Sequence, residues 1–409
     1  MKRIINSIAA FNIFAFLLMS CSKKIETIPT ENIIENNKVP AVIVDPINQT
    51  FGSNISLSNL ANYANQPIPA YITKDNGKAN PITNIKATIG RVLFYDKNLS
   101  VTNSVSCGSC HKQEFAFGDT ALVSKGVFTG TTIRHSTRLI NSRFSNESKF
   151  FWDERAASLE QQTTMPIQDH AEMGFSGQFG RANLTALLNK LGGIKYYNVL
   201  IKNAYGDTIV TEPRIQECLA QFVRSIQSFD SKYDIGRAAV RNNNDPFANF
   251  TAQENAGKTL YMNAPIFDAT GTRISGGVGC NGCHRAPEFD IDSNTRNNGI
   301  VGIINNVGID VNNTRAPSLR DLTKANGTVN TVMMHTGQMK NLRDVINHYQ
   351  NIPIVQGNNR LDNRLRPNGQ PQKLKMTETE ISNVISFLST LGGTNVYNDK
   401  KWSDPFLVK

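Results

Sequence analysis

Two five-residue segments of the form Cys-x-x-Cys-His carry the most specific chemistry in this chain. They read CGSCH at 107–111 and CNGCH at 280–284. In this pattern the two thiols add to the vinyl groups of a haem, and the histidine supplies an axial nitrogen to the iron. Because the pattern occurs twice, the sequence predicts two covalently attached haem c groups. The predicted attachment and ligand residues are Cys107, Cys110, His111, Cys280, Cys283 and His284.

Three residues follow the first segment at equal intervals. Trp152, Gln162 and Glu172 are each ten residues apart, and Pro166 lies between the last two. A carboxyl group that is partly desolvated beside a haem can move a proton between two oxygen atoms. The plainer interpretations are a surface carboxylate for Glu172 and a core residue for Trp152.

The segments around these residues, FWDER at 151–155 and MPIQDHAEMG at 165–174, resemble those of the bacterial di-haem cytochrome c peroxidase and MauG family. The resemblance extends from about residue 90 to about residue 393 and includes both haem-attachment segments. It implies a mainly α fold of two c-type cytochrome domains, each with one haem. The implied reaction is reduction of hydrogen peroxide to water, with electrons from a small cytochrome c or a cupredoxin.

The resemblance also implies that the two haems differ in function. Peroxide would bind at the haem on His111, where Glu172 would handle protons and Gln162 would orient the peroxide. Pro166 would shape the pocket, and Trp152 would relay electrons from the second haem. The alternative within the family is MauG-like chemistry, in which a high-valent haem state oxidises residues of a protein substrate. A cytochrome that only transfers electrons would instead have protein ligands on both sides of each iron.

The haem on His284 needs a second axial ligand, and the resemblance places it fourteen residues after His335. This position holds Tyr349, where well-known peroxidases have methionine and MauG has tyrosine. An anionic oxygen donor favours ferric iron, so tyrosine ligation predicts a lower reduction potential than methionine ligation. His348 or a nearby methionine are the rival ligands. The methionines expected to pack instead are Met333, Met334 and Met339.

The loop after the first attachment segment departs from many family peroxidases, which have a histidine there that caps the resting iron. Residues 126–131 contain no histidine, so we expect an open or water-bound iron that needs no reductive activation. His135 is the alternative cap. His135 also replaces an asparagine that helps to bind calcium in relatives, together with carbonyls near Asn330 and Val332. The resemblance thus implies one calcium ion, and this substitution argues against it, because histidine is a poor calcium ligand.

The first residues read as an export signal. A positive start at 1–3 precedes an apolar run at 4–19, and Leu-Met-Ser-Cys at 18–21 is typical of a lipoprotein cleavage site. We therefore expect a signal peptide at 1–20, a lipid on Cys21 and a tether at 21–67. The expected location is the periplasm, with the protein anchored to an envelope membrane.

A polar stretch at 241–246 marks the predicted boundary between two haem domains. The N-terminal domain, with the peroxidatic haem, would span 68–240, and the C-terminal domain, which transfers electrons, would span 241–409. The expected helices are at about 89–96, 213–229, 251–263 and 377–391. The helices before the two attachment segments play equivalent parts, so the chain reads as a distant internal duplication. Cys218 lies on an apolar helical stripe and is assigned to the core.

The chain has 409 residues and a formal net charge of +10. This charge suits an acidic partner surface or an anionic membrane face. The basic residues are scattered and form no block, so a nucleic-acid partner is not expected. A homodimer is carried over from the resemblance alone.

Overall fold

The computed structural model describes residues 45–408, except 147–148, 292–294, 305 and 313–317. The predicted signal peptide, the lipidation site at Cys21 and most of the predicted tether lie outside the described residues. Within the described ranges, every helix is too short or too polar to cross a membrane.

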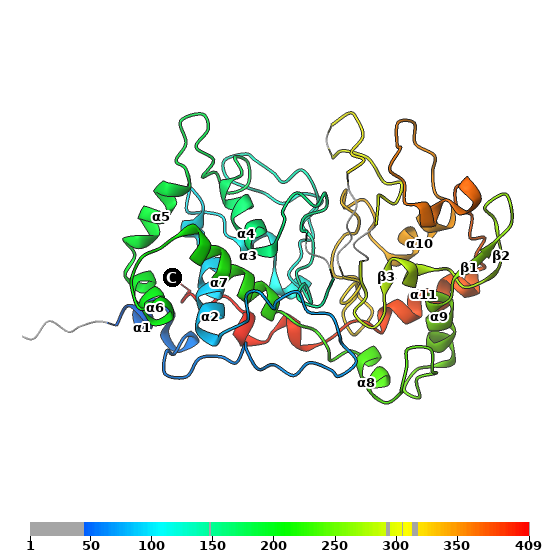
Figure 1. The fold of residues 1–409 in the computed structure, drawn as a ribbon, viewed down its shortest axis with the longest axis horizontal. Coiled ribbons are helices and arrows are strands. Elements are labelled where there is room, and N and C mark those ends of the chain that lie inside the picture. The colour runs from blue at the N-terminus through cyan, green and yellow to red at the C-terminus, as the bar shows by residue number, and fades with distance from the viewer. Residues whose placement is uncertain (1–44, 147–148, 292–294, 305, 313–317, 409) are drawn as a thin grey trace, which may run out of the picture. The chain divides into compact units, whose positions relative to one another are not determined.

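Helices make up most of the regular structure (Figure 1). They are α1 (Pro46–Phe51), α2 (Asn84–Tyr95), α3 (Cys107–Cys110), α4 (Leu159–Gln168), α5 (Leu184–Gly192), α6 (Lys195–Tyr205), α7 (Glu212–Ser225), α8 (Lys232–Ala238), α9 (Ala252–Met262), α10 (Leu342–Gln350) and α11 (Glu378–Ser389). Two short antiparallel pairs join β1 (Pro265–Phe267) to β2 (Arg273–Gly276) and β3 (His284–Arg285) to β4 (Asp290–Ile291), with Ile266 opposite Ser275 and His284 opposite Ile291. This agrees with the predicted mainly α fold.

The first core forms where α2 crosses α7. Gly90 makes the close approach possible, because a Cβ atom there would lie 2.0 Å from the carbonyl oxygen of Cys218. Cys218 is fully buried, as predicted. The helix predicted at 213–229 ends earlier, at Ser225, because Asn141 bonds the backbone beyond it. The Asn141 side chain donates to the carbonyl of Ser228 and accepts from its N–H, which holds this segment outside the helix.

The second core repeats this arrangement with α9 and α11. A Cβ atom on Gly257 would lie 1.9 Å from the carbonyl oxygen of Asn383. Both helices begin with reciprocal capping boxes, in which Thr251 and Thr377 pair with glutamates three residues later. The helix before each attachment segment therefore meets a later helix through a glycine, which supports the interpretation of an internal duplication.

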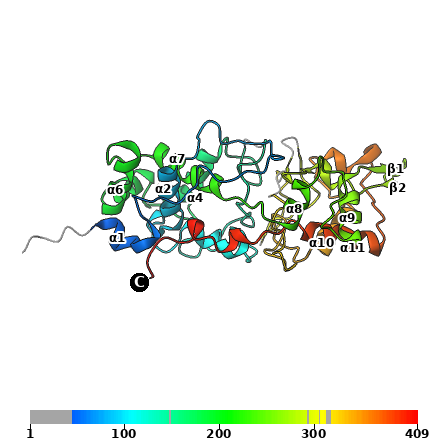
Figure 2. The same ribbon diagram turned by 90° about the horizontal axis from the view of Figure 1, so that it is seen from below.

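Three segments lie in a different core from the one that the predicted boundaries gave them. Ile47 and Phe51 of α1 are buried in the first core, so the tether expected at 21–67 ends before residue 45. Tyr233 of α8 packs on Phe247 and Phe289 in the second core, which moves the boundary from 240 to before residue 232. The C-terminal segment returns to the first half, where Trp402 is buried (Figure 2). Apolar side chains remote in sequence complete each core.

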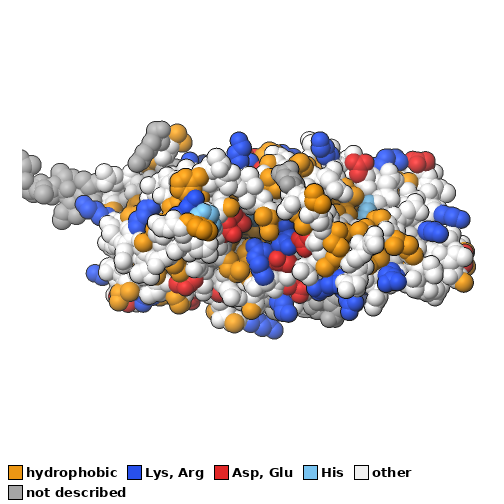
Figure 3. Space-filling view, turned by 90° about the horizontal axis from the view of Figure 1, so that it is seen from above, with side chains coloured by type: hydrophobic (Ala, Val, Ile, Leu, Met, Phe, Trp, Pro, Cys, Tyr) orange, Lys and Arg blue, Asp and Glu red, His pale blue; other side chains and the backbone are white. Residues whose placement is uncertain are grey.

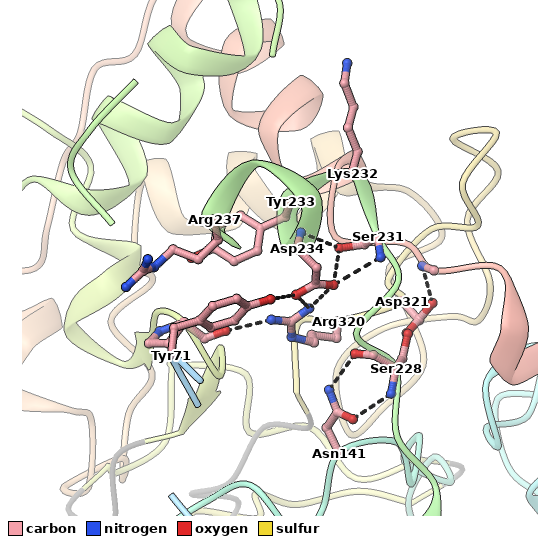
Figure 4. A network of polar contacts seen from close by, with 12 residues as sticks. Tyr71, Asn141, Ser228, Ser231, Lys232, Tyr233, Asp234, Arg237, Arg320 and Asp321 are labelled. Carbon is pink, nitrogen blue, oxygen red and sulfur yellow. Dashed lines mark hydrogen bonds and ion pairs between the residues drawn. The ribbon is translucent and has the colours of Figure 1, made fainter. Parts of the chain in front are cut away.

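A buried polar network holds α8 against neighbouring loops (Figure 4). The Arg320 guanidinium is fully buried and donates to both carboxylate oxygens of Asp234 at 2.8 Å. It also donates to the carbonyl of Pro287, and the Tyr71 hydroxyl donates to Asp234 at 2.7 Å. These bonds compensate the desolvation of both charges, and they tie residues 71, 234 and 320 into one unit.

Candidate active site

The first attachment segment presents its two thiols and its histidine from a short helical turn. Cys107 and Cys110 begin and end α3, and neither forms a disulfide. The Nδ1 atom of His111 lies 3.0 Å from the carbonyls of both Phe117 and Thr137. These acceptors keep the proton on Nδ1, which leaves Nε2 as the nitrogen that can bind iron. Burial lowers the pKa of His111, which favours the neutral imidazole that a metal requires.

Glu172 provides a desolvated carboxyl group near this segment. Burial, with a further contribution from the charge of Asp169, raises the pKa of Glu172 to about 7. Among the described residues, no group hydrogen-bonds its carboxylate. The pKa of Cys110 is raised to about 11, mainly by burial and also by the charge of Glu172. The Cys110 thiol therefore lies close enough to interact electrostatically with the carboxylate. The structure thus brings Glu172 and the first attachment segment together.

A short loop packs directly against the backbone that carries Glu172. The Val127 N–H donates to the Glu172 carbonyl at 3.0 Å. Cβ atoms on Gly126 and Gly130 would lie 1.9 Å and 2.3 Å from the carbonyl oxygen of Ala171. Any side chain at these glycines would push the loop away, so residues 126–130 are shaped to support the carboxyl segment.

Gln162 and Pro166 lie on α4, which comes just before Glu172 in the chain. Their separation of four residues places them on the same helical face. Proline has no N–H, so it cannot donate to the Gln162 carbonyl, and α4 ends two residues later. The neighbouring Gln161 is engaged elsewhere, because its side-chain oxygen accepts from the Ala157 N–H at 2.7 Å.

The second attachment segment opens into a cavity of about 620 Å³ that is lined mostly by apolar groups. Cys280, Cys283 and His284 all line it, and neither cysteine forms a disulfide. Its volume lies within the roughly 300–1,000 Å³ of cofactor pockets. The buried Nδ1 atom of His284 has no hydrogen-bond partner among the described residues. Burial and the charge of Arg364 lower the pKa of His284 to about 4, so the imidazole is neutral. Cavity, thiols and imidazole together fit a haem.

Trp152 lies where the two sites approach each other. Its Nε1–H donates to the His135 carbonyl at 2.8 Å, and its ring meets the His335 ring edge-on at 6.1 Å between centroids. All three residues line the second cavity. Two residues beyond His135, the Thr137 carbonyl accepts the bond from His111. A few residues therefore connect the wall of the second cavity to the histidine of the first site.

Tyr349 is the side chain at the end of α10 that enters the second cavity. Its Oη atom accepts a hydrogen bond from Asn298 Nδ2 at 3.0 Å, and burial raises its pKa. The rival His348 does not line the cavity, and its Nε2 atom lies 2.8 Å from the Asn298 carbonyl. Of the three methionines expected to pack, Met333 and Met334 line the cavity, as do Met262 and Met376, whereas Met339 is buried outside it.

Comparisons with known proteins agree with this geometry. The sequence profile of the family described as "Di-haem cytochrome c peroxidase" matches residues 84–242. The methylamine utilization protein MauG of Methylophilus methylotrophus is 26% identical over 325 residues, which cover 77% of this chain and 84% of the relative. The cytochrome c551 peroxidase of Pseudomonas aeruginosa is 23% identical over 344 residues, covering 80% and 84%. The chain is therefore similar to the di-haem cytochrome c peroxidase and MauG family, whose profile matches residues 84–242.

Solved structures show the same family fold. A MauG-like protein associated with microbial copper homeostasis matches with a TM-score of 0.63 at 25% identity, covering 83% of this chain and 99% of that protein. The di-haem peroxidase BthA of Burkholderia thailandensis matches with a TM-score of 0.57 at 20% identity, which shows the fold alone. The family consists of oxidoreductases that include cytochrome c peroxidases. This chain is likewise an oxidoreductase.

Two further expectations from the family pattern concern His135 and calcium. His135 faces the second cavity, and its Nδ1 atom lies 2.9 Å from the Ala121 carbonyl. The amide of Asn330 donates to the Asp321 carbonyl and to Tyr397 Oη. Among the described residues, no group of three or more His, Cys, Asp and Glu side chains is placed to hold a metal ion. The calcium ion implied by the family therefore stays a prediction.

Sequence reasoning missed two polar residues of the second cavity. Asn298 lies in an asparagine-rich stretch without a recognisable motif, and only the fold brings it to Tyr349. Arg138 is buried and donates to Thr331 Oγ1 and to the Ser318 carbonyl. Arg138 follows Thr137, whose carbonyl holds His111, but this contact is visible only in the structure.

Proposed function

We propose that this protein reduces hydrogen peroxide to water at the His111 site, with electrons from a small cytochrome c or a cupredoxin. The observation that carries the proposal is the half-buried Glu172 carboxyl group near the first attachment segment. Its pKa of about 7 keeps both protonation states populated at neutral pH, as proton transfer in both directions requires.

A haem held by Cys107, Cys110 and His111 would supply an iron position for peroxide and a path for two electrons. Glu172 accepts the proton of one peroxide oxygen and returns it to the other, which leaves as water. Overall, one hydrogen peroxide, two electrons and two further protons give two water molecules. The Gln162 amide donates a hydrogen bond that orients the peroxide, and Pro166 shapes the pocket wall.

We further propose that electrons enter at the His284 site and pass by way of Trp152. The contacts of Trp152 with His135 and His335 at the second cavity support this route. Tyr349 is the proposed axial ligand of the second haem, because it lines the cavity and His348 does not. At the first site, the loop without a histidine packs against the Glu172 segment, which supports an iron that needs no reductive activation.

The proposal also covers the location and assembly of the protein. We infer two covalently attached haem c groups, export to the periplasm and a lipid anchor at Cys21. A calcium ion between the haems and a homodimer are carried as expectations of the family. Figure 3 shows basic side chains dispersed over one face, with both charge signs close together near its middle. The net charge of +10 suits a donor with an acidic surface.

The decisive experiment is peroxide turnover by the oxidised, as-isolated protein with reduced cytochrome c. Glu172→Gln keeps the shape of the side chain but removes the transferable proton, so turnover should fall by about 10²- to 10⁴-fold. Glu114→Gln is the matched control, because Glu114 is an exposed glutamate close to the first attachment segment, and it should turn over normally. Equal activity of wild type and Glu172→Gln would refute the role of Glu172.

The MauG-like alternative is kept open by Tyr349, which lies in the second cavity at the position where MauG has a tyrosine ligand. It predicts no turnover with cytochrome c and a long-lived oxidised spectrum after peroxide is added. That result would replace peroxide reduction with oxidation of a protein substrate as the proposed reaction.

A further inference from the structure

The side-chain amide of Asn298 lies between two groups that can each donate an electron pair to a metal. Its Nδ2 atom is 3.0 Å from Tyr349 Oη and 3.4 Å from Met334 Sδ. Asn298, Tyr349 and Met334 all line the cavity that contains the second attachment segment. One amide therefore contacts both an oxygen and a sulfur candidate for the same axial position.

One bond fixes the orientation of this amide, and a second holds the backbone of the same residue. The Asn298 Oδ1 atom accepts from the Ile300 N–H at 3.2 Å, so the opposite end, Nδ2, is the one that reaches Tyr349. The Asn298 carbonyl lies 2.8 Å from His348 Nε2. His348 and Tyr349 are adjacent on α10, so the helix grips the backbone and the side chain of Asn298 at once.

We propose that Asn298 is a positioning residue that holds Tyr349 as the axial oxygen donor of the second haem and thereby sets its reduction potential. The inference rests on the proposed ligand role of Tyr349. A hydrogen bond from the amide withdraws electron density from the phenol oxygen, which weakens its donation to iron and raises the potential. The Met334 sulfur is a weak acceptor on the same amide, so this contact also keeps Met334 beside Tyr349 and not in its place.

The test is the midpoint potential and the low-spin spectrum of the second haem in the complete di-haem protein. Asn298→Leu removes the donor, and its potential should fall by at least 59 mV, which is a tenfold change for a one-electron couple. Asn298→Ser should behave in the same way. Its hydroxyl can still accept from the Ile300 N–H, but it is too short to reach Tyr349, so this variant preserves the local turn. Asn347→Leu changes an exposed asparagine on α10, the helix that carries Tyr349, and should leave the potential unchanged.

A second comparison shows through which side chain Asn298 acts. In a Tyr349→Phe background, the Asn298 substitutions should produce no further shift in potential. A shift that persists there but disappears in Met334→Leu would assign the effect to the sulfur and overturn the proposal. An unchanged potential in both Asn298 variants would overturn it too.

These readouts are independent of peroxide turnover. If wild type fails to reduce peroxide while the potential shifts as expected, the proposed reaction falls and the role of Asn298 stands. If Tyr349→Phe leaves the low-spin spectrum unchanged, Tyr349 is not the ligand and the positioning role falls with it.

Discussion

In the first half of the chain, Gly90 lies against the backbone of Cys218, and in the second half Gly257 lies against the backbone of Asn383. The two helix crossings are built alike, but the surroundings of the two histidines differ. Nδ1 of His111 has two carbonyl acceptors at 3.0 Å, whereas the buried Nδ1 of His284 has none among the described residues. The two helix crossings are alike, so the connecting loops determine the polar environment of each histidine.

The same contrast extends to the groups that would face each iron. Near the first segment, Glu172 is a desolvated carboxyl group without a hydrogen-bond partner among the described residues. At the second segment, the phenol of Tyr349 is held by an amide inside an apolar cavity. The group proposed to exchange protons is left free of fixed bonds, whereas the group proposed to bind a metal is fixed in place. This difference suits catalysis at one site and electron transfer at the other.

The strongest test of the shared scaffold is to enlarge its two glycines. Gly90→Val and Gly257→Val place a side chain on a neighbouring carbonyl, so each should lower the free energy of unfolding by about 3 kcal/mol. Urea unfolding of the intact protein, followed by circular dichroism, measures the loss. Gly192→Val is the control, because a Cβ atom there meets nothing within 4 Å. Tolerance of either core substitution would show that the two crossings are not equivalent.

The dependence of the free energy of unfolding on pH should show an effect of nearly the same size, and this effect belongs to the first site. The pKa of Glu172 is about 7 in the folded protein and 4.5 in its ordinary state, so the folded protein disfavours the carboxylate. The stability contributed by the protonated group is complete below pH 4.5 and is lost as pH rises through about 7. The loss amounts to roughly 3 kcal/mol.

Denaturant titrations at several pH values should show that the stability of wild type falls with rising pH. The same titrations should show no such slope for Glu172→Gln. Glu114→Gln should retain the slope of wild type. If the stability of Glu172→Gln depends on pH as that of wild type does, another group causes the dependence.

We expect an effect of intermediate size when one of the two tryptophans, Trp152, is substituted, and the other serves as the comparison. Trp152→Phe keeps an aromatic ring but leaves the His135 carbonyl without its donor, which should cost about 1–3 kcal/mol. It should also slow electron transfer between the haems, measured by stopped-flow reduction. Trp402→Phe loses a longer bond of 3.3 Å to Ser225 Oγ, in the first core, and should leave that rate unchanged. Equal rates in both variants would remove Trp152 from the electron path.

The smallest expected effect concerns an ion pair that links the two halves. Arg134 pairs with Asp153 at 2.8 Å and with Asp310 at 2.6 Å, and these side chains are 12–17% exposed. Asp310→Asn removes one of the two carboxylates, so stability should fall by about 1 kcal/mol, and less at high salt. The exposed pair of Arg343 and Glu378 is the reference, and Arg343→Gln should cost almost nothing. Salt-independent loss would point to packing and not to charge.

Local sequence patterns determined the parts of this protein that depend on neighbouring residues. The two attachment segments, the capping boxes at Thr251 and Thr377, and the resemblance to the family follow from short spacings in the chain. The roles of Glu172, Gln162 and Pro166 stay proposals, although the structure brings Glu172 and the first attachment segment together.

Only the tertiary structure decided the features that join remote residues. Trp402 completes the first core although it follows the whole second half, and Asn141 ends α7 by bonding the backbone of Ser228. Asn298 reaches Tyr349 across 51 positions of the chain. No periodicity or motif records these meetings, because burial and hydrogen bonding are satisfied by whichever side chains the fold places together.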